Sequence, residues 1–135
     1  MESILVDTSV WIDWFSTKNN DTDQTTILEA YFNARVPVYS TAVILQEVLQ
    51  GVRQEHMYLT IKETLLGIPI LRLDPIDAAI GAADLYRSLR KKGVTIRKPN
   101  DCLIAHYAIF YDMPILHNDV DFDQIARHTA LRLVV

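Results

Sequence analysis

Short apolar runs alternate with longer stretches of helical hydrophobic spacing along the whole chain. The runs, which we predict to be strands, are residues 3–6, 36–39, 68–73, 114–117 and 131–135. Between them, apolar residues recur three or four positions apart, which is typical of helices that bury one face. Strands that alternate with helices in this way indicate a parallel sheet with helices on both faces. We therefore expect an α/β fold.

Residues that cap helices mark several of the predicted boundaries. Thr8 or Ser9 can cap the first helix, and Ser40 or Thr41 the helix over residues 43–52, because a hydroxyl accepts a bond from a free backbone N–H. The predicted helices cover residues 10–15, 27–32, 43–52, 54–66, 75–92, 101–110 and 122–126.

The length and composition fit a folded enzyme-sized domain. With 135 residues, half of them hydrophobic and 22% charged, the chain can bury a core, so we assign residues 1–135 to one domain. The single cysteine, Cys102, allows no internal disulfide, which suits a reducing compartment. No apolar run approaches membrane-spanning length, and the first residues lack the long apolar core of a signal peptide. We therefore expect a cytoplasmic protein that does not enter membranes.

Four acids occupy comparable places in the predicted fold. Asp7 follows the first strand, and Asp119 follows the fourth. Asp101 opens the helix before that fourth strand, and Glu47 lies within the helix that follows the second. Because open α/β sheets bind their ligands at the carboxyl ends of the strands, we expect these four side chains to converge there.

Each of these acids also has a simpler interpretation. Asp7 could serve only as a helix cap, and Glu47 could lie on the flank of its helix and reach solvent. Asp121 is followed three residues later by Gln124, which is the spacing of a capping box. We therefore assign Asp121 to capping and Asp119 to a metal.

Converging carboxylates repel one another and need a cation. Carboxylate oxygens without nearby cysteines or paired histidines favour Mg²⁺ or Mn²⁺ over zinc. Mg²⁺ binds through a few carboxylates together with substrate phosphates, which suits phosphodiester hydrolysis. Cys102 lies in an apolar helical pattern and is predicted to belong to the core, so it is not a convincing nucleophile.

A basic segment precedes Asp101 in the chain. The net charge of −4 does not by itself indicate nucleic-acid binding, but residues 87–98 hold six bases and no acid. A compensated helix end explains Lys91 and Lys92, but it does not explain the bases after Gly93. We predict that four of the bases contact RNA phosphates: Arg87, Arg90, Arg97 and Lys98. The alternative is a solvated helix end and loop.

Four segments together resemble the PIN-domain family, and most closely its VapC-type toxins of prokaryotic toxin–antitoxin pairs. They are residues 5–10, 44–48, 101–105 and 118–122, and they follow in order over nearly the whole chain. The resemblance implies a metal-dependent endoribonuclease, often dimeric, that a small antitoxin protein holds inactive. It also implies that the metal-binding acids are Asp7, Glu47, Asp101 and Asp119. Asn118 departs from the pattern, since such proteins often carry a hydroxyl residue nearby.

We therefore expect an enzyme that cleaves RNA with a metal-activated water. A phosphoryl-transfer enzyme with Asp7 as nucleophile would need a second Asp beside it or a Lys at a strand end, and neither is evident. A PIN fold that only binds RNA or a partner protein is the other alternative, against which the four acids argue. A homodimer is expected through the small-residue face of residues 76–86 and apolar residues of 54–66.

Overall fold

Three short parallel strands form the sheet in the computed structural model, which describes residues 1–18 and 21–134. The central strand is β1 (Ile4–Val6), with β2 (Val38–Tyr39) on one side and β3 (Ile115–Leu116) on the other. Both pairs are parallel. The carboxyl ends of the strands therefore meet at one edge, as the sequence predicts.

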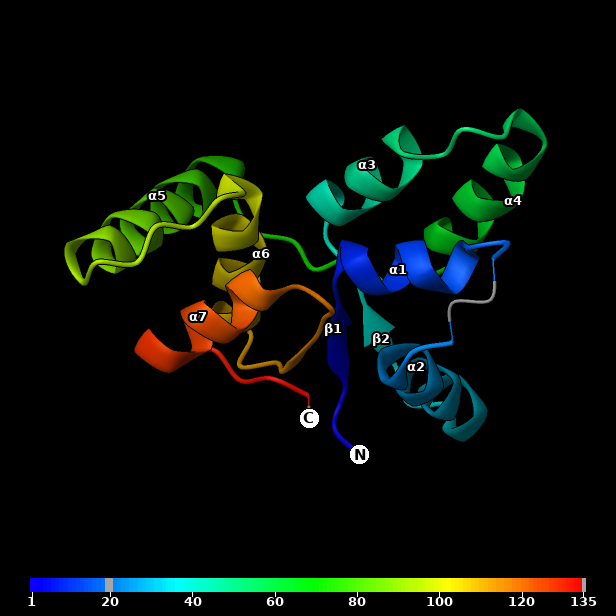
Figure 1. Cartoon of the computed structure of the whole chain (residues 1–135), viewed down its shortest axis with the longest axis horizontal. Helices are drawn as coiled ribbons and strands as arrows, with labels where there is room; N and C mark the ends of the chain where they lie inside the picture. Colours follow the sequence, from blue (N-terminus) through cyan, green and yellow to red (C-terminus); the bar gives the residue numbers. More distant parts are fainter. Residues whose placement is uncertain (19–20, 135) are drawn as a thin grey trace.

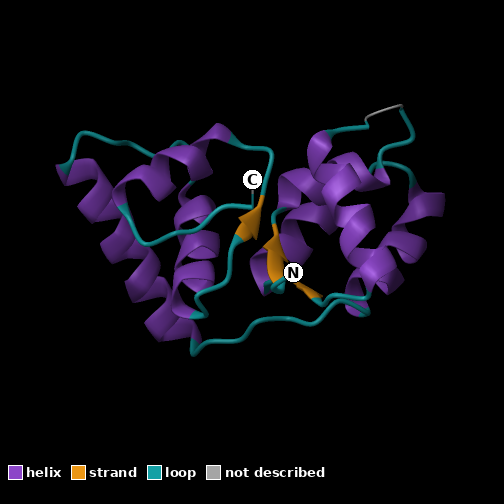
Figure 2. Cartoon of the chain, turned by 90° about the horizontal axis from the view of Figure 1, so that it is seen from below, coloured by secondary structure: helices purple, strands orange, loops and turns teal. Residues whose placement is uncertain are grey.

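Helices cover the sheet from both sides, which confirms the predicted α/β architecture (Figure 1, Figure 2). On one side lie α1 (Thr8–Phe15), α2 (Asp23–Ala34), α3 (Ala42–Gln50) and α4 (Glu55–Leu66). On the other side lie α5 (Pro75–Lys91), α6 (Pro99–Phe110) and α7 (Val120–His128). In the described part of the chain, no helix is both long enough and apolar enough to cross a membrane.

The core is built around β1, whose three residues are fully buried. Such a strand has no polar face because helices cover both of its faces. The two largest fully buried side chains, Trp11 of α1 and Phe122 of α7, come from opposite sides of the sheet. The carboxyl edge of the sheet therefore adjoins a fully buried apolar core.

Two predicted strands are wrong. Residues 68–73 contribute only an isolated bridge between Ile70 and Ser40, because Pro69 has no N–H to donate and pairs only through its carbonyl. Residues 131–134 likewise contribute one bridge, between Leu133 and Ile115. Residue 135, the end of the last predicted strand, lies outside the described residues.

Some predicted helix starts also need correction. Asp7 caps α1, not Thr8 or Ser9, and its side chain accepts a bond from the Ser9 N–H. Thr41 caps α3, as one of the two predicted candidates. The helix α6 begins at Pro99, two residues before the predicted start, because proline suits a first-turn position where its missing N–H has no helical partner.

The helix α6, which carries Asp101, packs closely against α5. A Cβ atom at Gly81 of α5 would lie 2.2 Å from Cε1 of His106. Glycine therefore allows the His106 ring of α6 to approach the backbone of α5. This close approach is one part of the extensive packing between α5 and α6, the helix that carries Asp101.

Candidate active site

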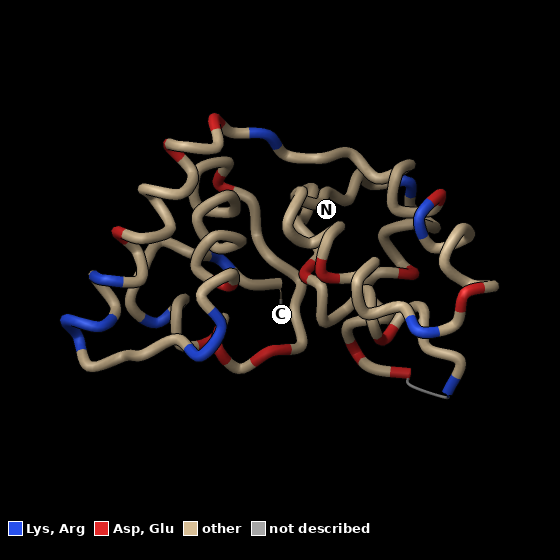
Figure 3. The backbone as a smooth tube through the Cα atoms, turned by 90° about the horizontal axis from the view of Figure 1, so that it is seen from above, with Lys and Arg blue, Asp and Glu red and all other residues tan. Residues whose placement is uncertain are grey.

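Five acids from five elements or loops gather at the carboxyl edge of the sheet. Asp7 follows β1, Asp119 follows β3, and Glu47 comes from α3, while Asp101 and Asp121 belong to the first turns of α6 and α7. Figure 3 shows acidic segments close together near the middle of the molecule, whereas basic segments gather toward the end of α5. The structure thus brings carboxylates together although they are up to 114 residues apart in the sequence.

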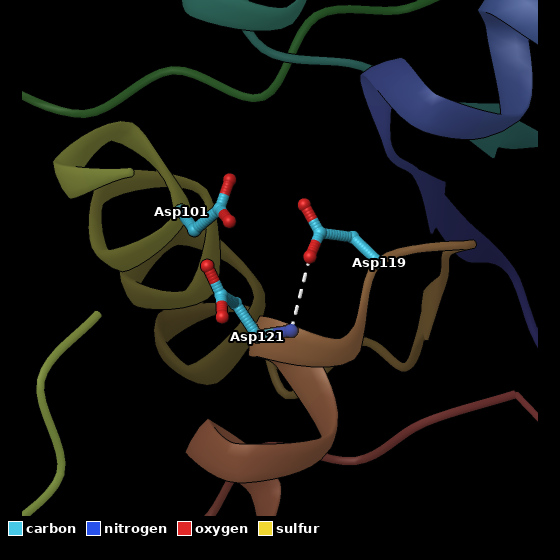
Figure 4. Close-up of side chains that lie close together, drawn as sticks. All are labelled: Asp101, Asp119 and Asp121. Carbon is cyan, nitrogen blue, oxygen red and sulfur yellow. Dashed lines mark hydrogen bonds between the residues drawn. The ribbon is translucent and has the colours of Figure 1, made fainter. Parts of the chain in front are cut away.

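Three of the aspartates form a tight cluster. One carboxylate oxygen from each of Asp101, Asp119 and Asp121 lies within 4.8 Å of the other two. Their side chains point toward one another from α6, the loop after β3 and α7 (Figure 4). Asp101 and Asp121 are only 4% and 5% exposed, so little water is available to separate their charges.

The electrostatics of Asp101 show how crowded this cluster is. Burial, together with the negative charges of Asp7 and Asp119, raises the pKa of Asp101 to about 8. Burial also raises the pKa of Asp7. Two neighbouring carboxyls whose pKa values are both raised mark a place where a cation would be favoured.

Asp119 behaves in the opposite way because it has positive neighbours. Burial favours a higher pKa for Asp119, but the Lys98 ammonium, the Asp121 N–H and Arg97 outweigh it and lower that pKa. Asp119 is also the N-cap of α7: its Oδ1 accepts a bond from the Asp121 N–H at 3.0 Å (Figure 4).

Asp121 is therefore not the capping residue that the sequence predicted. The helix α7 starts at Val120, so Asp119 occupies the N-cap and Asp121 falls in the first turn. There its carboxylate faces Asp101 and joins the cluster. The spacing to Gln124 misled the sequence interpretation, because an acid two residues before Asp121 could cap the same helix equally well. The presence of Asp119 at that position was the feature of the sequence that could have indicated the correct cap.

Asp7 fills the capping role that the sequence left as one alternative, and it also lies at the sheet edge. Its Oδ2 accepts bonds from the Ser9 N–H at 3.0 Å and the Ser9 hydroxyl at 2.6 Å, so it caps α1. Ser9 Oγ in turn accepts a bond from the Asn118 N–H at 2.9 Å. Ser9 thereby links the ends of β1 and β3, a supporting role that sequence reasoning missed. Asp7 Oδ1 remains buried and unpaired among the described residues.

Glu47 lies beside Asp7 rather than turning away toward solvent. The Thr8 hydroxyl donates a 2.7 Å hydrogen bond to Glu47 Oε1, and the Glu47 side chain is half-buried. Its negative charge is one of the smaller causes that raise the pKa of Asp7. Glu47 is not part of the three-aspartate cluster, so it lies on the α1–α3 side of the site.

The predicted basic residues divide into two pairs. Arg97 lies 3.4 Å from Asp121 Oδ1 and 3.8 Å from Asp119 Oδ1, and Lys98 donates a hydrogen bond to Asp119 Oδ2. Arg90 instead lies over the Tyr86 ring on α5, and Arg87 lines a surface hollow beside Pro99. Only the first pair touches the acids.

The donor set suits a hard divalent cation. Asp7 Oδ1, Asp101 Oδ2 and Asp121 Oδ2 are buried without a hydrogen-bond partner in the described part of the chain. Burying unpaired carboxylate oxygens is costly unless a charge or a metal compensates. The tight cluster consists of aspartates alone, and oxygen-only sets of this kind match Mg²⁺ or Mn²⁺ rather than zinc.

Comparison with protein families and curated proteins gives a consistent result. The model of the PIN domain family matches residues 4–128. VapC ribonuclease Mb1587 of Mycobacterium bovis is 36% identical over 130 residues, which cover 96% of each chain. Ribonuclease VapC11 of Mycobacterium tuberculosis matches with the same identity and coverage.

Solved structures share the fold. VapBC2 from Rickettsia felis, solved with a promoter DNA fragment, has a TM-score of 0.75 at 18% identity and covers 98% of this chain and 97% of that chain. VapBC-5 from Mycobacterium tuberculosis has a TM-score of 0.68 at 22% identity, covering 99% and 98%. At these identities the structures establish the fold, and the family match establishes the relationship. The chain belongs to the PIN-domain family and, within it, to the VapC group.

Proposed function

We propose that this chain is a metal-dependent endoribonuclease that hydrolyses RNA phosphodiester bonds, and that it is the toxin of a toxin–antitoxin pair. The observation that carries the proposal is the set of buried, unpaired carboxylate oxygens of Asp7, Asp101 and Asp121 beside Asp119. The names of the curated relatives, which are ribonucleases, support the choice of RNA as substrate.

The proposed cofactor is Mg²⁺, with Mn²⁺ as a substitute. Asp7, Asp101, Asp119 and Asp121 would hold it, and Glu47 would complete the site from the α3 side. Such an ion lowers the pKa of a bound water and offsets the negative charge that develops on the phosphate. The carboxylates of these acids come from separate, well-packed elements, which favours a preorganised site.

The hydroxyl residues of α1 orient the acids that face them. Thr8 holds Glu47 through its hydroxyl, and Ser9 holds Asp7 through both its N–H and its hydroxyl. A hydroxyl or N–H donor favours the charged form of the carboxylate that accepts its bond, and it fixes the direction of that carboxylate. No covalent nucleophile is needed, and Cys102 is unsuited to that role because it is buried and burial raises its pKa to about 11.

RNA must dock on a protein whose net charge is −4. We propose that Arg97 and Lys98 contact phosphates next to the acids and that Arg87 and Arg90 extend the track along α5. Phosphate contacts of this kind position the strand and make affinity fall with salt concentration.

We further propose two protein partners and a location. A small antitoxin is supported by the similar VapBC structures, one of which is a member of the VapBC family of toxin–antitoxin systems. A second copy of the chain is supported by large apolar side chains exposed on α5 and α4: Ile76, Ile80, Leu59 and Leu66. Cytoplasmic location is supported by the RNA substrate and by the free thiol of Cys102.

The test is cleavage of unstructured RNA by purified protein without antitoxin, in Mg²⁺ and in excess chelator. We expect cleavage in Mg²⁺ alone, and none by an Asp101→Asn variant in either condition. RNA binding without cleavage by the wild-type protein would overturn the proposal in favour of a PIN fold that only binds RNA or a partner.

A further inference from the structure

Among the four aspartates at the sheet edge, Asp119 is the one with a partner on each oxygen. Its Oδ1 accepts the Asp121 N–H, and its Oδ2 accepts a hydrogen bond from the Lys98 ammonium. Asp7, Asp101 and Asp121 each keep a buried oxygen that has no partner among the described residues. A divalent ion could therefore approach three of these acids directly, but it would meet Lys98 at the fourth.

The Lys98 ammonium is central to the charges of the site, although its side chain is 57% exposed. Its hydrogen bond with Asp119 raises the pKa of Lys98, and the charges of Asp101, Asp119 and Asp7 add to this effect. Three carboxylates thus stabilise the positive charge of Lys98, and the same negative potential would also stabilise a divalent ion at this place.

The local sequence does not by itself favour a lysine at this place. Lys98 is the N-cap of α6, where a cation meets the positive end of the helix dipole, and its side chain caps no N–H. Serine, threonine or aspartate would stabilise this helix start better. The contact with Asp119, 21 residues away, is the interaction that compensates.

The attachment of Lys98 keeps it close to the acids. The Asp101 N–H donates to the Lys98 carbonyl at 2.9 Å, so the lysine stem and the Asp101 carboxylate start from the same helical turn. Only the side-chain torsions of Lys98 separate a position on Asp119 from a position in solvent. A charge tethered this closely has a high effective concentration at the site.

We infer that the Lys98 ammonium is a tethered competitor of the divalent ion for the Asp119 carboxylate, so that ion binding releases Lys98 from Asp119 toward solvent and the incoming RNA phosphate. This inference rests on the proposed function, because it requires an ion among these acids. It adds that Lys98 sets the affinity for the ion and that ion binding and phosphate binding by Lys98 are coupled. By linkage, each event then favours the other.

The test measures Mn²⁺ binding by electron paramagnetic resonance, which reports free Mn²⁺ without any need for RNA cleavage. The proteins are the wild type, Lys98→Met, Lys98→Arg and the control Lys91→Met, which removes the same charge from the last turn of α5. We expect Lys98→Met to bind Mn²⁺ about fivefold to tenfold more tightly than Lys91→Met, as for the loss of one partly buried ion pair. Lys98→Arg, which keeps the charge, should stay near the wild type.

A second measurement keeps the test valid if folding is affected. In chelator, Lys98→Met should melt at a lower temperature than Lys91→Met because the aspartates lose their counter-charge. In saturating Mn²⁺ the two variants should melt at the same temperature. A Lys98→Met variant that remains less stable in Mn²⁺ would show a purely structural role and overturn the inference.

The two possible failures are distinguishable. Equal Mn²⁺ affinities for Lys98→Met and Lys91→Met would overturn the competition and leave the proposed ribonuclease site intact. A wild-type protein that binds no Mn²⁺ would overturn both. Tighter binding by Lys98→Met without RNA cleavage by any variant would support the competition and contradict the proposed function.

Discussion

The two halves of the acidic site are supported by different chemistry. On the α1–α3 side, Asp7 and Glu47 are held by the hydroxyls of Ser9 and Thr8. On the α6–α7 side, Asp119 and Asp121 face the cations Arg97 and Lys98. A hydroxyl orients a carboxylate and leaves its charge, whereas a cation neutralises it.

This difference suggests that the two halves of the site respond to different changes. The hydroxyl-supported half has no cation of its own among the described residues, so its acids keep their geometry but are not neutralised within the chain. In the cation-supported half, Arg97 and Lys98 partly neutralise the acids. This neutralisation can change when an ion or a phosphate binds. We expect the hydroxyl-supported half to be sensitive to mutations that remove its orienting hydrogen bonds. We expect the cation-supported half to be sensitive to salt and to added metal.

The largest expected effect comes from neutralising one buried aspartate in each half. Asp7→Asn and Asp101→Asn should each lower RNA cleavage at least about a thousandfold, because each removes a carboxylate that we propose as a metal ligand, with little change in shape. Asp101→Asn should also melt at a higher temperature than the wild type in chelator near pH 7, since asparagine is neutral without the proton that Asp101 must take up on folding. Cleavage within tenfold of the wild type for either variant would remove that residue from the site.

A mutation that adds one methyl group can disturb the cation-supported half without touching any acid. Gly81→Ala would place its Cβ 2.2 Å from the His106 ring and push α6, which carries Asp101, away from α5. The free energy of unfolding should fall by about 1–3 kcal/mol. In an open helix the same substitution would stabilise by about 1 kcal/mol, so the sign of the change is decisive.

Chemical denaturation of Gly81→Ala and of Gly81→Ala/His106→Ala checks this contact. When His106 is already alanine, Gly81→Ala should lower the free energy of unfolding less than it does in the wild type, because the ring that it would clash with is gone. Gly81→Ala as stable as the wild type would show that α6 is not held in this way.

Replacing the Thr8 hydroxyl with a methyl group tests the hydroxyl-supported half. Thr8→Val keeps the shape of the side chain but removes the bond to Glu47, so cleavage should fall about tenfold. Thr8→Ser, which keeps a hydroxyl, should cleave nearly as well as the wild type. The account of this half fails if Thr8→Val and Thr8→Ser have the same rate constant.

The smallest expected effects concern RNA docking. In an Asp101→Asn background, replacing Arg97 and Lys98 with alanine should weaken RNA binding a few-fold and reduce the salt slope by about one to two. The matched change of Arg87 and Arg90, which do not touch the acids, should have a smaller effect on affinity. If neither pair alters the affinity or its slope, the basic segment is only a solvated helix end and loop.

The sequence predicted the places of Asp7 and Asp119 better than it predicted the contacts around them. The apolar run of β1 and the helical pattern after it are enough to place Asp7 at a strand end. The predicted parallel order then brings Asp119 to the same edge. Both inferences depend on local patterns and on the common direction of parallel strands.

The role of Asp121 and the pairing of Lys98 with Asp119 depend on tertiary structure. Whether Asp119 or Asp121 caps α7 is set by a shift of two residues, which local pattern cannot decide. Lys98 meets Asp119 because α6 and α7 pack together, and the local sequence does not specify which helices pack against each other. The predicted strands 68–73 and 131–135 failed for a related reason, since apolar residues can be buried beside a sheet without pairing along it.

The most direct test of the central claim, that these acids form a cation site, is the pH dependence of Mg²⁺ binding by calorimetry. Burial and neighbouring charges raise the pKa of Asp101 to about 8, so at pH 6 the folded protein holds a proton that Mg²⁺ must displace. We expect the affinity to rise from pH 6 to pH 8 and proton release to be larger at pH 6 than at pH 8. Affinity that is independent of pH, or that Asp101→Asn retains in full, would contradict the account.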